Sequence, residues 1–196
     1  MDGTYSPVCS LLEQAANIVR RKKAATTTLG PAEGYKRGQI EELISYADTY
    51  NIWISLSALN LEFLSKGGEN EVYTNDTDIV FKLNNFEYAG DDLDNFFIRI
   101  FAHNKFFCNV PYQLVGFSYN AQNEFCAVLI QPYIRALREA TEEEIAEYME
   151  ALGFIKDYVD EFHNDVYIIF DAVPNNILYG IDGNLYFIDT QIRLRT

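Results

Sequence analysis

The hydrophobic pattern of the first third of the chain has the period of α-helices. Over residues 8–23, five apolar side chains fall on one helical face and a proline precedes them. They are Val8, Leu11, Leu12, Ala15 and Val19. Residues 24–38 are rich in Thr, Gly and Pro and predict a loop, and apolar residues in step over 40–47 predict a second helix. We therefore expect residues 1–58 to form an N-terminal helical segment.

The pattern changes to short strands after residue 60. Apolar runs at 61–64, 71–74 and 78–83 are separated by turn residues, so they predict a three-strand antiparallel meander. An apolar stripe over 91–107, with acidic residues at its start, predicts a helix. Two further strands are expected at 112–119 and 124–130. Gln131-Pro132 is expected to end the second of these, because proline cannot donate to a strand ladder.

The last third predicts helices followed by a hairpin. Thr141 and the three glutamates after it form a capping box, and Gly153 suits the end of that helix. A further helical stretch is expected before the apolar run 166–170. Two short apolar runs around Asp182-Gly183 then predict a hairpin. The order of the predicted elements is β-β-β-α-β-β, then helices, a loop and a hairpin, which makes the chain an α+β protein.

A constellation of polar residues accompanies this hairpin. Asp171 is followed five residues later by Asn176, and Asp189 ends the last apolar run. Phosphotransferases use an Asp at the acceptor hydroxyl, and an Asn and a second Asp on the magnesium ions of ATP. Asp, Asn and Pro are also common turn formers, and Asp189 alone would be an ordinary strand-end residue. The three residues together favour a kinase-like site over a plain turn.

Lys82 and a glycine pair lie where such a site requires them. Lys82 is on the third predicted strand, the position from which a kinase lysine holds the α- and β-phosphates. Gly67-Gly68 lies in the turn between the first two strands and resembles a reduced phosphate-covering loop without the full G-x-G-x-x-G spacing. Taken singly, Lys82 would be an exposed strand residue and the glycines a plain hairpin turn.

Several positions depart from the usual kinase pattern. Ile169-Phe170 stands where His-Arg normally precedes the catalytic Asp, and Thr190-Gln191 stands where Phe-Gly normally follows the metal-binding Asp. The 91–107 helix offers no Glu to pair with Lys82. The acidic residues nearest to that role are Glu87, Asp91, Asp92 and Asp94, and none has the expected position.

With these motifs the chain resembles the small kinase-like domains of bacterial polyvalent proteins of mobile elements, and more distantly the aminoglycoside phosphotransferase-type kinases. The resemblance covers about residues 60–192. Its residues are Gly67–Tyr73, Lys82, His103-Asn104, Tyr112, Gly116-Phe117, Gln131-Pro132, Gly153-Phe154 and the block from Asp171 to Asp189. It implies a protein-kinase-like two-lobe fold: an N-lobe with a five-stranded antiparallel sheet over 59–131 and a reduced helical C-lobe over 132–196.

Three hypotheses for function follow. In an ATP- and Mg²⁺-dependent phosphotransferase, Asp171 would be catalytic and Asn176 and Asp189 would hold the metal. Gly67, Gly68 and Lys82 would bind the phosphates, and adenine would dock near Gln131. Alternatively, the missing Glu, Thr190-Gln191 and the short stretch after Asp189 favour a catalytically degenerate pseudokinase that binds a nucleotide or a protein. An unrelated fold with chance motifs would leave Lys82 and Asp189 far apart.

Charge narrows the possible partners. With 15 basic and 29 acidic residues the formal net charge is −14, which argues against nucleic acid as a partner. The one basic cluster, Arg20–Lys23, is predicted to be a solvated helix end. The acceptor of a phosphoryl group, whether a protein or a small molecule, is not indicated by the sequence.

Other features bear on compartment and on the histidines. Three widely spaced cysteines, Cys9, Cys108 and Cys126, predict free thiols in a reducing compartment rather than a metal site. The chain starts with polar residues, and no apolar run approaches the ~18 residues of a membrane span. We therefore expect a cytoplasmic protein without a membrane partner. His103 is expected to pack or cap and His163 to be exposed, rather than to take part in catalysis.

Overall fold

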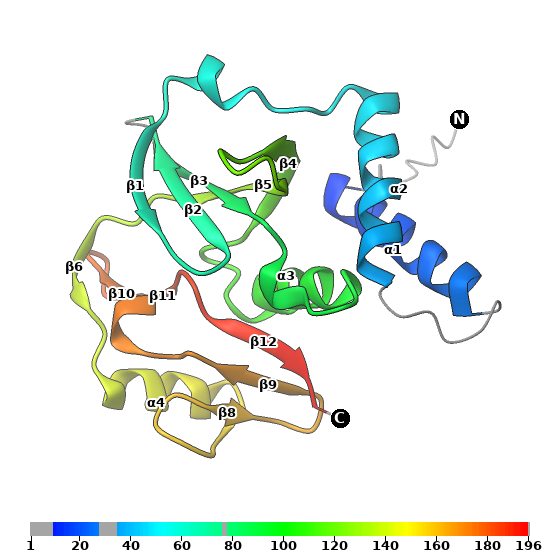
Figure 1. Ribbon diagram of the computed structural model, residues 1–196. Coiled ribbons are helices and arrows are strands. Elements are labelled where there is room, and N and C mark those ends of the chain that lie inside the picture. The colour runs from blue at the N-terminus through cyan, green and yellow to red at the C-terminus, as the bar shows by residue number, and fades with distance from the viewer. Residues whose placement is uncertain (1–9, 28–34, 76–77, 196) are drawn as a thin grey trace, which may run out of the picture.

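The structure is a computed structural model that describes residues 10–27, 35–75 and 78–195, without the side chains of residues 26 and 27. These residues form a mixed α+β fold with four α-helices, a five-stranded antiparallel sheet and two smaller sheets (Figure 1). The predicted α+β class is confirmed. Residue Cys9 and the middle of the loop predicted over 24–38 lie outside the described residues.

The large sheet contains all five strands predicted for it. Their order across the sheet is β1 (Glu62–Lys66), β2 (Asn70–Thr74), β3 (Ile79–Asn84), β5 (Phe125–Pro132) and β4 (Gln113–Tyr119), with every pair antiparallel. β5 runs on through Gln131, and Pro132 is its last residue, paired with Ile79. The proline is therefore the last residue of the strand rather than the first residue after it. Because proline has no N–H, the next bond to the neighbouring chain is donated by the Tyr133 N–H to the Asp78 carbonyl.

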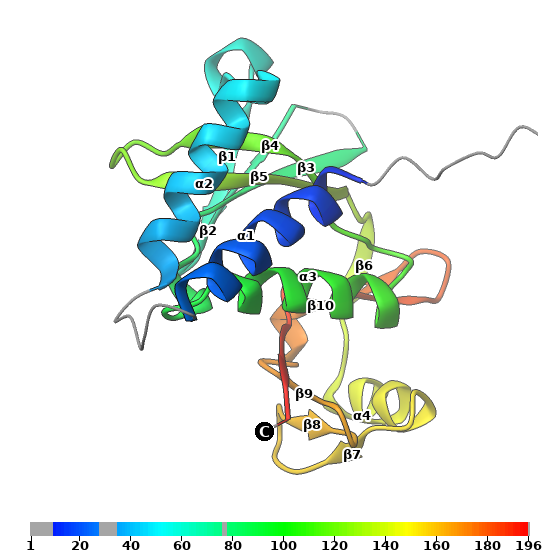
Figure 2. The same ribbon diagram turned by 90° about the vertical axis from the view of Figure 1, so that its right-hand side faces the viewer.

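Three helices cover one side of this sheet. α3 (Asp94–Phe106) packs against it, α1 (Leu11–Thr27) packs on α3 and β4, and α2 (Tyr35–Tyr50) packs on α1 (Figures 1 and 2). Buried apolar side chains from all three helices join those of the sheet in one hydrophobic cluster. The two predicted N-terminal helices are thus confirmed, and they form part of this core rather than a separate unit.

The basic cluster Arg20–Lys23 is not a helix end, because α1 continues to Thr27. Arg20 pairs with Asp94 at 2.8 Å and Lys23 with Asp92 at 2.5 Å, both at the start of α3. The prediction of a solvated terminus was therefore wrong. The cations instead bind acidic residues that the sequence places at the start of α3, where they suit the helix dipole.

The rest of the chain contains one α-helix and seven short strands. They are β6 (Ala136–Glu139), α4 (Glu142–Ala151), β7 (Ile155–Lys156), β8 (Phe162–His163), β9 (Tyr167–Phe170), β10 (Ile177–Gly180), β11 (Leu185–Phe187) and β12 (Gln191–Leu194). One sheet has the order β11-β10-β6 and the other β12-β9-β8-β7. The predicted hairpin is confirmed as β10–β11.

The capping box of α4 is also confirmed, with Thr141 Oγ1 accepting from the Glu144 N–H at 3.2 Å and Glu144 accepting from the Thr141 N–H at 2.9 Å. Gly153 ends the helix with a φ of 83°. The helical stretch expected beyond it was wrong. That segment forms the β7–β8 hairpin, which buries Phe162 against Ile169 of β9.

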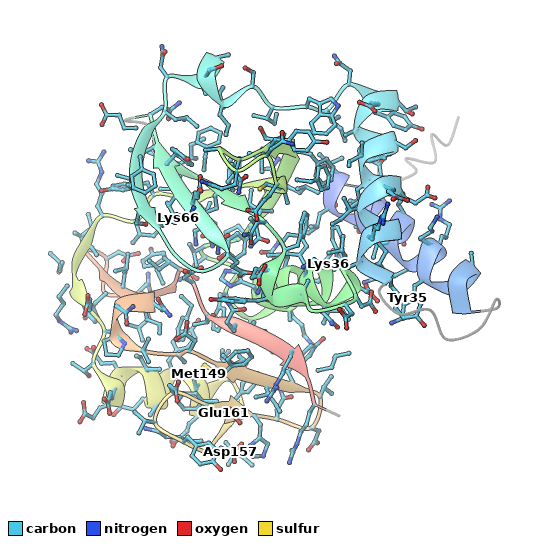
Figure 3. The ribbon with its side chains drawn as sticks, in the orientation of Figure 1. Tyr35, Lys36, Lys66, Met149, Asp157 and Glu161 are labelled. Carbon is cyan, nitrogen blue, oxygen red and sulfur yellow. The ribbon has the colours of Figure 1, made fainter. Side chains whose placement is uncertain are left out.

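A second hydrophobic cluster lies beneath the first. Ile145 and Met149 of α4 pack in it with Phe162, Phe187 and side chains of the small sheets. Figure 3 labels Met149 in this half of the molecule. The chain crosses between the two halves of the molecule after β5, and again where Ile188 and Asp189 return toward the large sheet (Figure 1). These crossings bring the polar residues of the tail close to β3.

The two histidines have hydrogen-bond partners, and the described cysteines are free. His103 is buried with its Nε2 at 3.0 Å from the Val110 carbonyl, and burial lowers its pKa to about 4, so it is neutral and donates this bond. His163 is largely covered rather than exposed, with its Nδ1 2.6 Å from Asp157. Cys108 is exposed and Cys126 buried, and both are free thiols. Within the described ranges, no helix is long and apolar enough to span a membrane.

Candidate active site

The glycine turn closes the β1–β2 hairpin. The Gly67 N–H donates to the Asn70 carbonyl at 2.8 Å, and Lys66 and Glu71 face each other across the strands. Gly67 lines a cleft under the sheet. Gly68 does not line this cleft, because it faces Tyr88: a Cβ at Gly68 would lie 1.8 Å from the Tyr88 hydroxyl.

Lys82 extends from the middle of β3 into the space beneath the sheet. Its ammonium group is buried and lies 2.7 Å from the Ile188 carbonyl, 3.1 Å from the Tyr112 hydroxyl and 3.3 Å from Asp189 Oδ1. The sequence predicted that a chance resemblance would leave Lys82 and Asp189 far apart. Their ion pair contradicts that hypothesis.

The electrostatics of Lys82 keep it charged. Burial by itself lowers the pKa of an ammonium group, but Tyr112 and the Asp189 carboxylate outweigh it and raise the pKa above its ordinary value. Tyr112 is buried as well, and burial raises the pKa of its phenol, so it acts as a neutral hydrogen-bonding group. Among the described residues, Asp189 is the one carboxylate within ion-pair distance of Lys82.

Asp171 and Asn176 form a compact loop after β9. Asn176 donates its side-chain N–H to both the backbone carbonyl of Asp171 at 3.0 Å and its carboxylate at 2.9 Å. The loop places Asp171 at a φ of 58°, in the left-handed region that Asp adopts more readily than most residues. The five-residue spacing in the sequence thus corresponds to a direct side-chain contact.

The surroundings of Asp171 raise the pKa of its carboxyl above the ordinary value. Partial burial raises the pKa of its carboxyl, and the charges of Asp189 and Asp160 act in the same direction. The hydrogen bond from Asn176 opposes them, because it stabilises the ionised form. The net direction is upward.

A cleft of about 390 Å³ lies between the large sheet and the β10–β11 hairpin. Lys82, Asn176 and Asp189 all line it, together with Gly67 and Gln131. Apolar side chains from both sides complete its wall: Leu64, Val72, Val80, Ile134, Leu178 and Ile188. The volume is in the range typical of small-ligand sites.

Two of the predicted residues have other surroundings. Gln131 turns its side-chain amide away from the cleft, donating to the Val110 carbonyl at 3.0 Å, and it is almost fully buried. Asp171 lines a second cleft of about 750 Å³, which lies between Tyr88, α3, β9 and β12. The predicted residues therefore divide between two clefts, which the bond from Asn176 to Asp171 connects.

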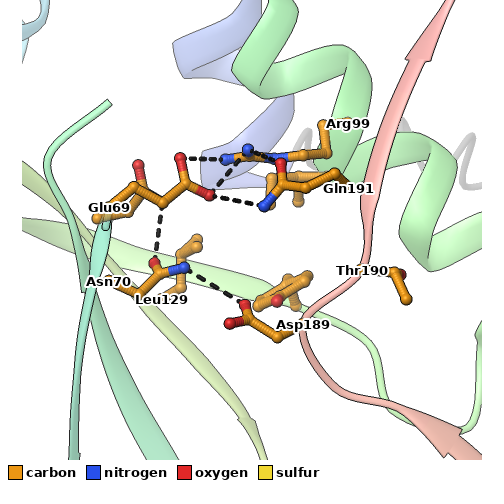
Figure 4. A pocket seen from close by; sticks show the side chains of 10 residues that line it. Glu69, Asn70, Arg99, Leu129, Asp189, Thr190 and Gln191 are labelled. Atoms are coloured by element: carbon orange, nitrogen blue, oxygen red, sulfur yellow. Dashed lines mark hydrogen bonds and ion pairs between the residues drawn. The ribbon is translucent and has the colours of Figure 1, made fainter. Parts of the chain in front are cut away.

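A buried polar network, which the sequence did not reveal, joins the glycine turn to α3 and β12. Arg99 of α3 binds both carboxylate oxygens of Glu69, at 2.8 and 3.0 Å, and also donates to Gln191 (Figure 4). Asn70 in turn donates to Asp189 Oδ1 at 3.4 Å (Figure 4). The acidic candidates Asp92 and Asp94 pair with Lys23 and Arg20 instead of Lys82.

A family model described as a serine/threonine/tyrosine kinase found in polyvalent proteins matches residues 36–196. The chain belongs to this family. No match was found among curated proteins. Membership of a kinase family implies a phosphotransferase that uses a nucleotide. The matched range begins within α2, so α1 lies outside it although α1 shares the hydrophobic core of α3.

Proposed function

We propose that this chain is an ATP- and Mg²⁺-dependent phosphotransferase with a kinase-like two-lobe architecture. Residues 59–131 would form the first lobe and 132–196 the second, and the N-terminal segment 1–58 would add α1 and α2 to the first. The observation that carries the proposal is the convergence of Lys82, Asn176 and Asp189 on one cleft. These residues come from three separate segments, and a kinase needs all three at the phosphates of its nucleotide.

The apolar half of the cleft suits a purine base. Val72 and Val80 of the sheet and Leu178 of the hairpin line it from opposite sides, so a flat ring would be held between them. The chain at 131–134 forms one edge. Because the side chain of Gln131 turns inward, any polar contact to adenine at this edge would come from the backbone.

The polar half of the cleft suits the phosphates. Lys82 would hold them as its counterpart does in other kinases, and the Gly67–Asn70 turn would cover them. In this state Lys82 contacts Asp189 at 3.3 Å, so a bound phosphate would replace or share that contact. The raised pKa keeps the ammonium group charged for either partner.

The residues present fit magnesium. Asp189 and Asn176 supply a carboxylate and an amide oxygen, the hard oxygen donors that Mg²⁺ prefers. Asn176 uses its N–H group on Asp171, and its amide oxygen accepts a 3.3 Å bond from the Asn175 side chain that a metal ion would have to replace or share. The described part of the chain has no group of three or more His, Cys, Asp or Glu side chains for a metal. Phosphate oxygens and water would therefore complete the coordination, and the metal would neutralise phosphate charge.

Asp171 would orient the acceptor hydroxyl and take up its proton as the hydroxyl oxygen attacks the γ-phosphorus and the bond to ADP breaks. Its raised pKa makes it a better proton acceptor than an ordinary carboxylate. Its position on the second cleft, next to the nucleotide cleft, would let an acceptor enter from the other side.

The alternative is a degenerate kinase fold that binds a nucleotide or a protein without phosphoryl transfer. The absence of an acidic partner for Lys82 on the described α3 favours it, because α3 presents Arg99 there instead. Both candidates predict nucleotide binding, and ATP turnover separates them. A chain that binds ATP with magnesium but never releases phosphate would be the degenerate form.

Calorimetric titration of ATP, with and without Mg²⁺, tests the proposal. Wild-type protein should bind ATP with a magnesium-dependent affinity, and Asp189→Ala should abolish that dependence while Lys82→Met weakens binding at every magnesium concentration. Asp165→Ala removes an exposed carboxylate outside the cleft and serves as the matched control. Magnesium dependence that survives Asp189→Ala would contradict the metal assignment.

A further inference from the structure

The ion pair between Arg99 and Glu69 lies in an unusual place for a buried charge pair. Both side chains are almost fully buried, at 7% and 5% exposure, and Arg99 grips both carboxylate oxygens. Glu69 belongs to the glycine turn, and Arg99 lies in the middle of α3 on its buried face. Burying two charges is unfavourable unless the pair is well matched, and removing one partner of such a pair leaves an uncompensated buried charge.

The position of Glu69 poses an electrostatic problem for the proposed function. A carboxylate in a turn that covers phosphates carries the same sign of charge as the nucleotide. At low effective dielectric such like charges repel strongly. Arg99 supplies the opposite charge at 2.8 and 3.0 Å, so the pair as a whole is neutral toward the phosphates.

The same arginine fixes the position of the turn. Besides Glu69 it donates to Gln191, two residues after Asp189, and Gln191 in turn donates to Glu69 at 3.3 Å (Figure 4). The backbone of Glu69 also accepts from Asn85 at 3.0 Å. The guanidinium group of Arg99 therefore contacts both the glycine turn and the segment after Asp189, and the bonds of Gln191 and Asn85 to Glu69 add to this network.

We propose that Arg99 is a positioning residue for the nucleotide phosphates, which acts by neutralising Glu69 and fixing the glycine turn over the cleft. The proposal rests on the assignment of the cleft to ATP. Arg99 does not need to touch the nucleotide. Its effect is confined to the phosphate end, because the apolar wall for the base, Val72, Val80 and Leu178, lies outside the network.

Because adenosine lacks the phosphates, the test compares the binding of ATP with that of adenosine in calorimetric titrations of the full chain. Arg99→Met should weaken ATP binding by about tenfold or more, a change of ~1.4 kcal/mol, while adenosine binding is unchanged. Glu69→Gln should weaken ATP less, because it removes the repulsive charge. The double variant Glu69→Gln/Arg99→Met should recover much of the loss.

Arg135→Met is the matched control, because Arg135 forms an exposed pair with Asp78 at 3.4 Å, away from the network. If Arg99→Met does not fold, Arg99→Lys keeps the charge without the two-pronged geometry and should give a smaller loss for ATP alone. Equal affinity of Arg99→Met and wild type for ATP would overturn the proposal, as would equal losses for ATP and adenosine. A wild type that binds no ATP would contradict the proposed function instead.

Discussion

At the scale of single residues, Asp171 combines a left-handed backbone with a perturbed acid strength. A φ of 58° is uncommon outside glycine, and in this loop it is held by the two bonds that Asn176 donates to Asp171. The pKa of Asp171 is raised by burial and by two neighbouring carboxylates, and lowered by Asn176. Substitution of a neighbouring carboxylate or of Asn176 should therefore change the pKa of Asp171.

Asp160 offers the cleanest change in this tuning. Its charge raises the pKa of Asp171, so Asp160→Asn should lower that pKa. If Asp171 must be ionised to accept a proton, the acid limb of phosphate release from ATP should move to lower pH. A pH profile of kcat/KM measures the shift, with Asp165→Asn as the control. A limb that stays in place or moves to higher pH would contradict the role given to Asp171.

The sequence could predict which side chains meet at the cleft where their types and spacings form a motif. Lys82, Asn176 and Asp189 were found because their types and local spacings reflect the chemistry that a nucleotide demands. Arg99 and Glu69 were not found, because they are 30 residues apart and meet only through the packing of α3 beneath the sheet. The inward turn of Gln131 likewise depends on the carbonyl of Val110, which local sequence does not place.

At the scale of elements, side-chain hydrogen bonds from α2 add to the apolar packing that holds the N-terminal helices on α3. Gln39 of α2 is fully buried, accepts from the Leu93 N–H at 2.8 Å and donates to Asp92 at 2.8 Å. Lys36 adds bonds to the chain just before α3, and Figure 3 shows it between the two helices. α2 thus adds a cap at the start of α3, whose N-cap residue Leu93 makes no side-chain cap and whose Asp94 N–H donates to Asp92.

Gln39→Ala tests this capping role. It leaves the buried Leu93 N–H without its acceptor, while Asp92 loses one donor and keeps the Asp94 N–H and Lys23. We therefore expect a loss of about 2 kcal/mol in the free energy of unfolding. Urea denaturation measures the loss, and Gln122→Ala, at an exposed turn, is the control. A loss within the ~0.5 kcal/mol of ordinary surface substitutions would show that α2 does not hold α3 in this way.

The strands that were not predicted from the sequence were missed for physical reasons. β6 has every side chain exposed, so no apolar alternation marks it, and it is defined only by pairing with β10. β7 and β8 have two residues each, too few for any period to be read. α3 was predicted correctly because it buries one face, and burial imposes the period of 3.6 residues. The strands of the large sheet were predicted from apolar runs bounded by turn residues, β1 among them although its side chains are exposed.

At the scale of the whole molecule, two hydrophobic clusters lie on either side of the cleft lined by Lys82 and Asp189. The upper cluster unites the large sheet with α1, α2 and α3, and the lower one unites α4 with the small sheets. Polar contacts that involve Lys82, Asn70 and Arg99 link them across the cleft. A ligand in the cleft would contact both halves, which is the arrangement that a two-lobe kinase uses to position its phosphates.

The most direct measurement is a crystal structure with a non-hydrolysable ATP analogue and Mn²⁺, whose anomalous signal locates the metal. The account predicts the base between Val80 and Leu178, the phosphates at Lys82, and manganese bound by Asp189 and Asn176. A nucleotide found elsewhere, or a metal peak away from Asp189, would contradict the assignment of this cleft.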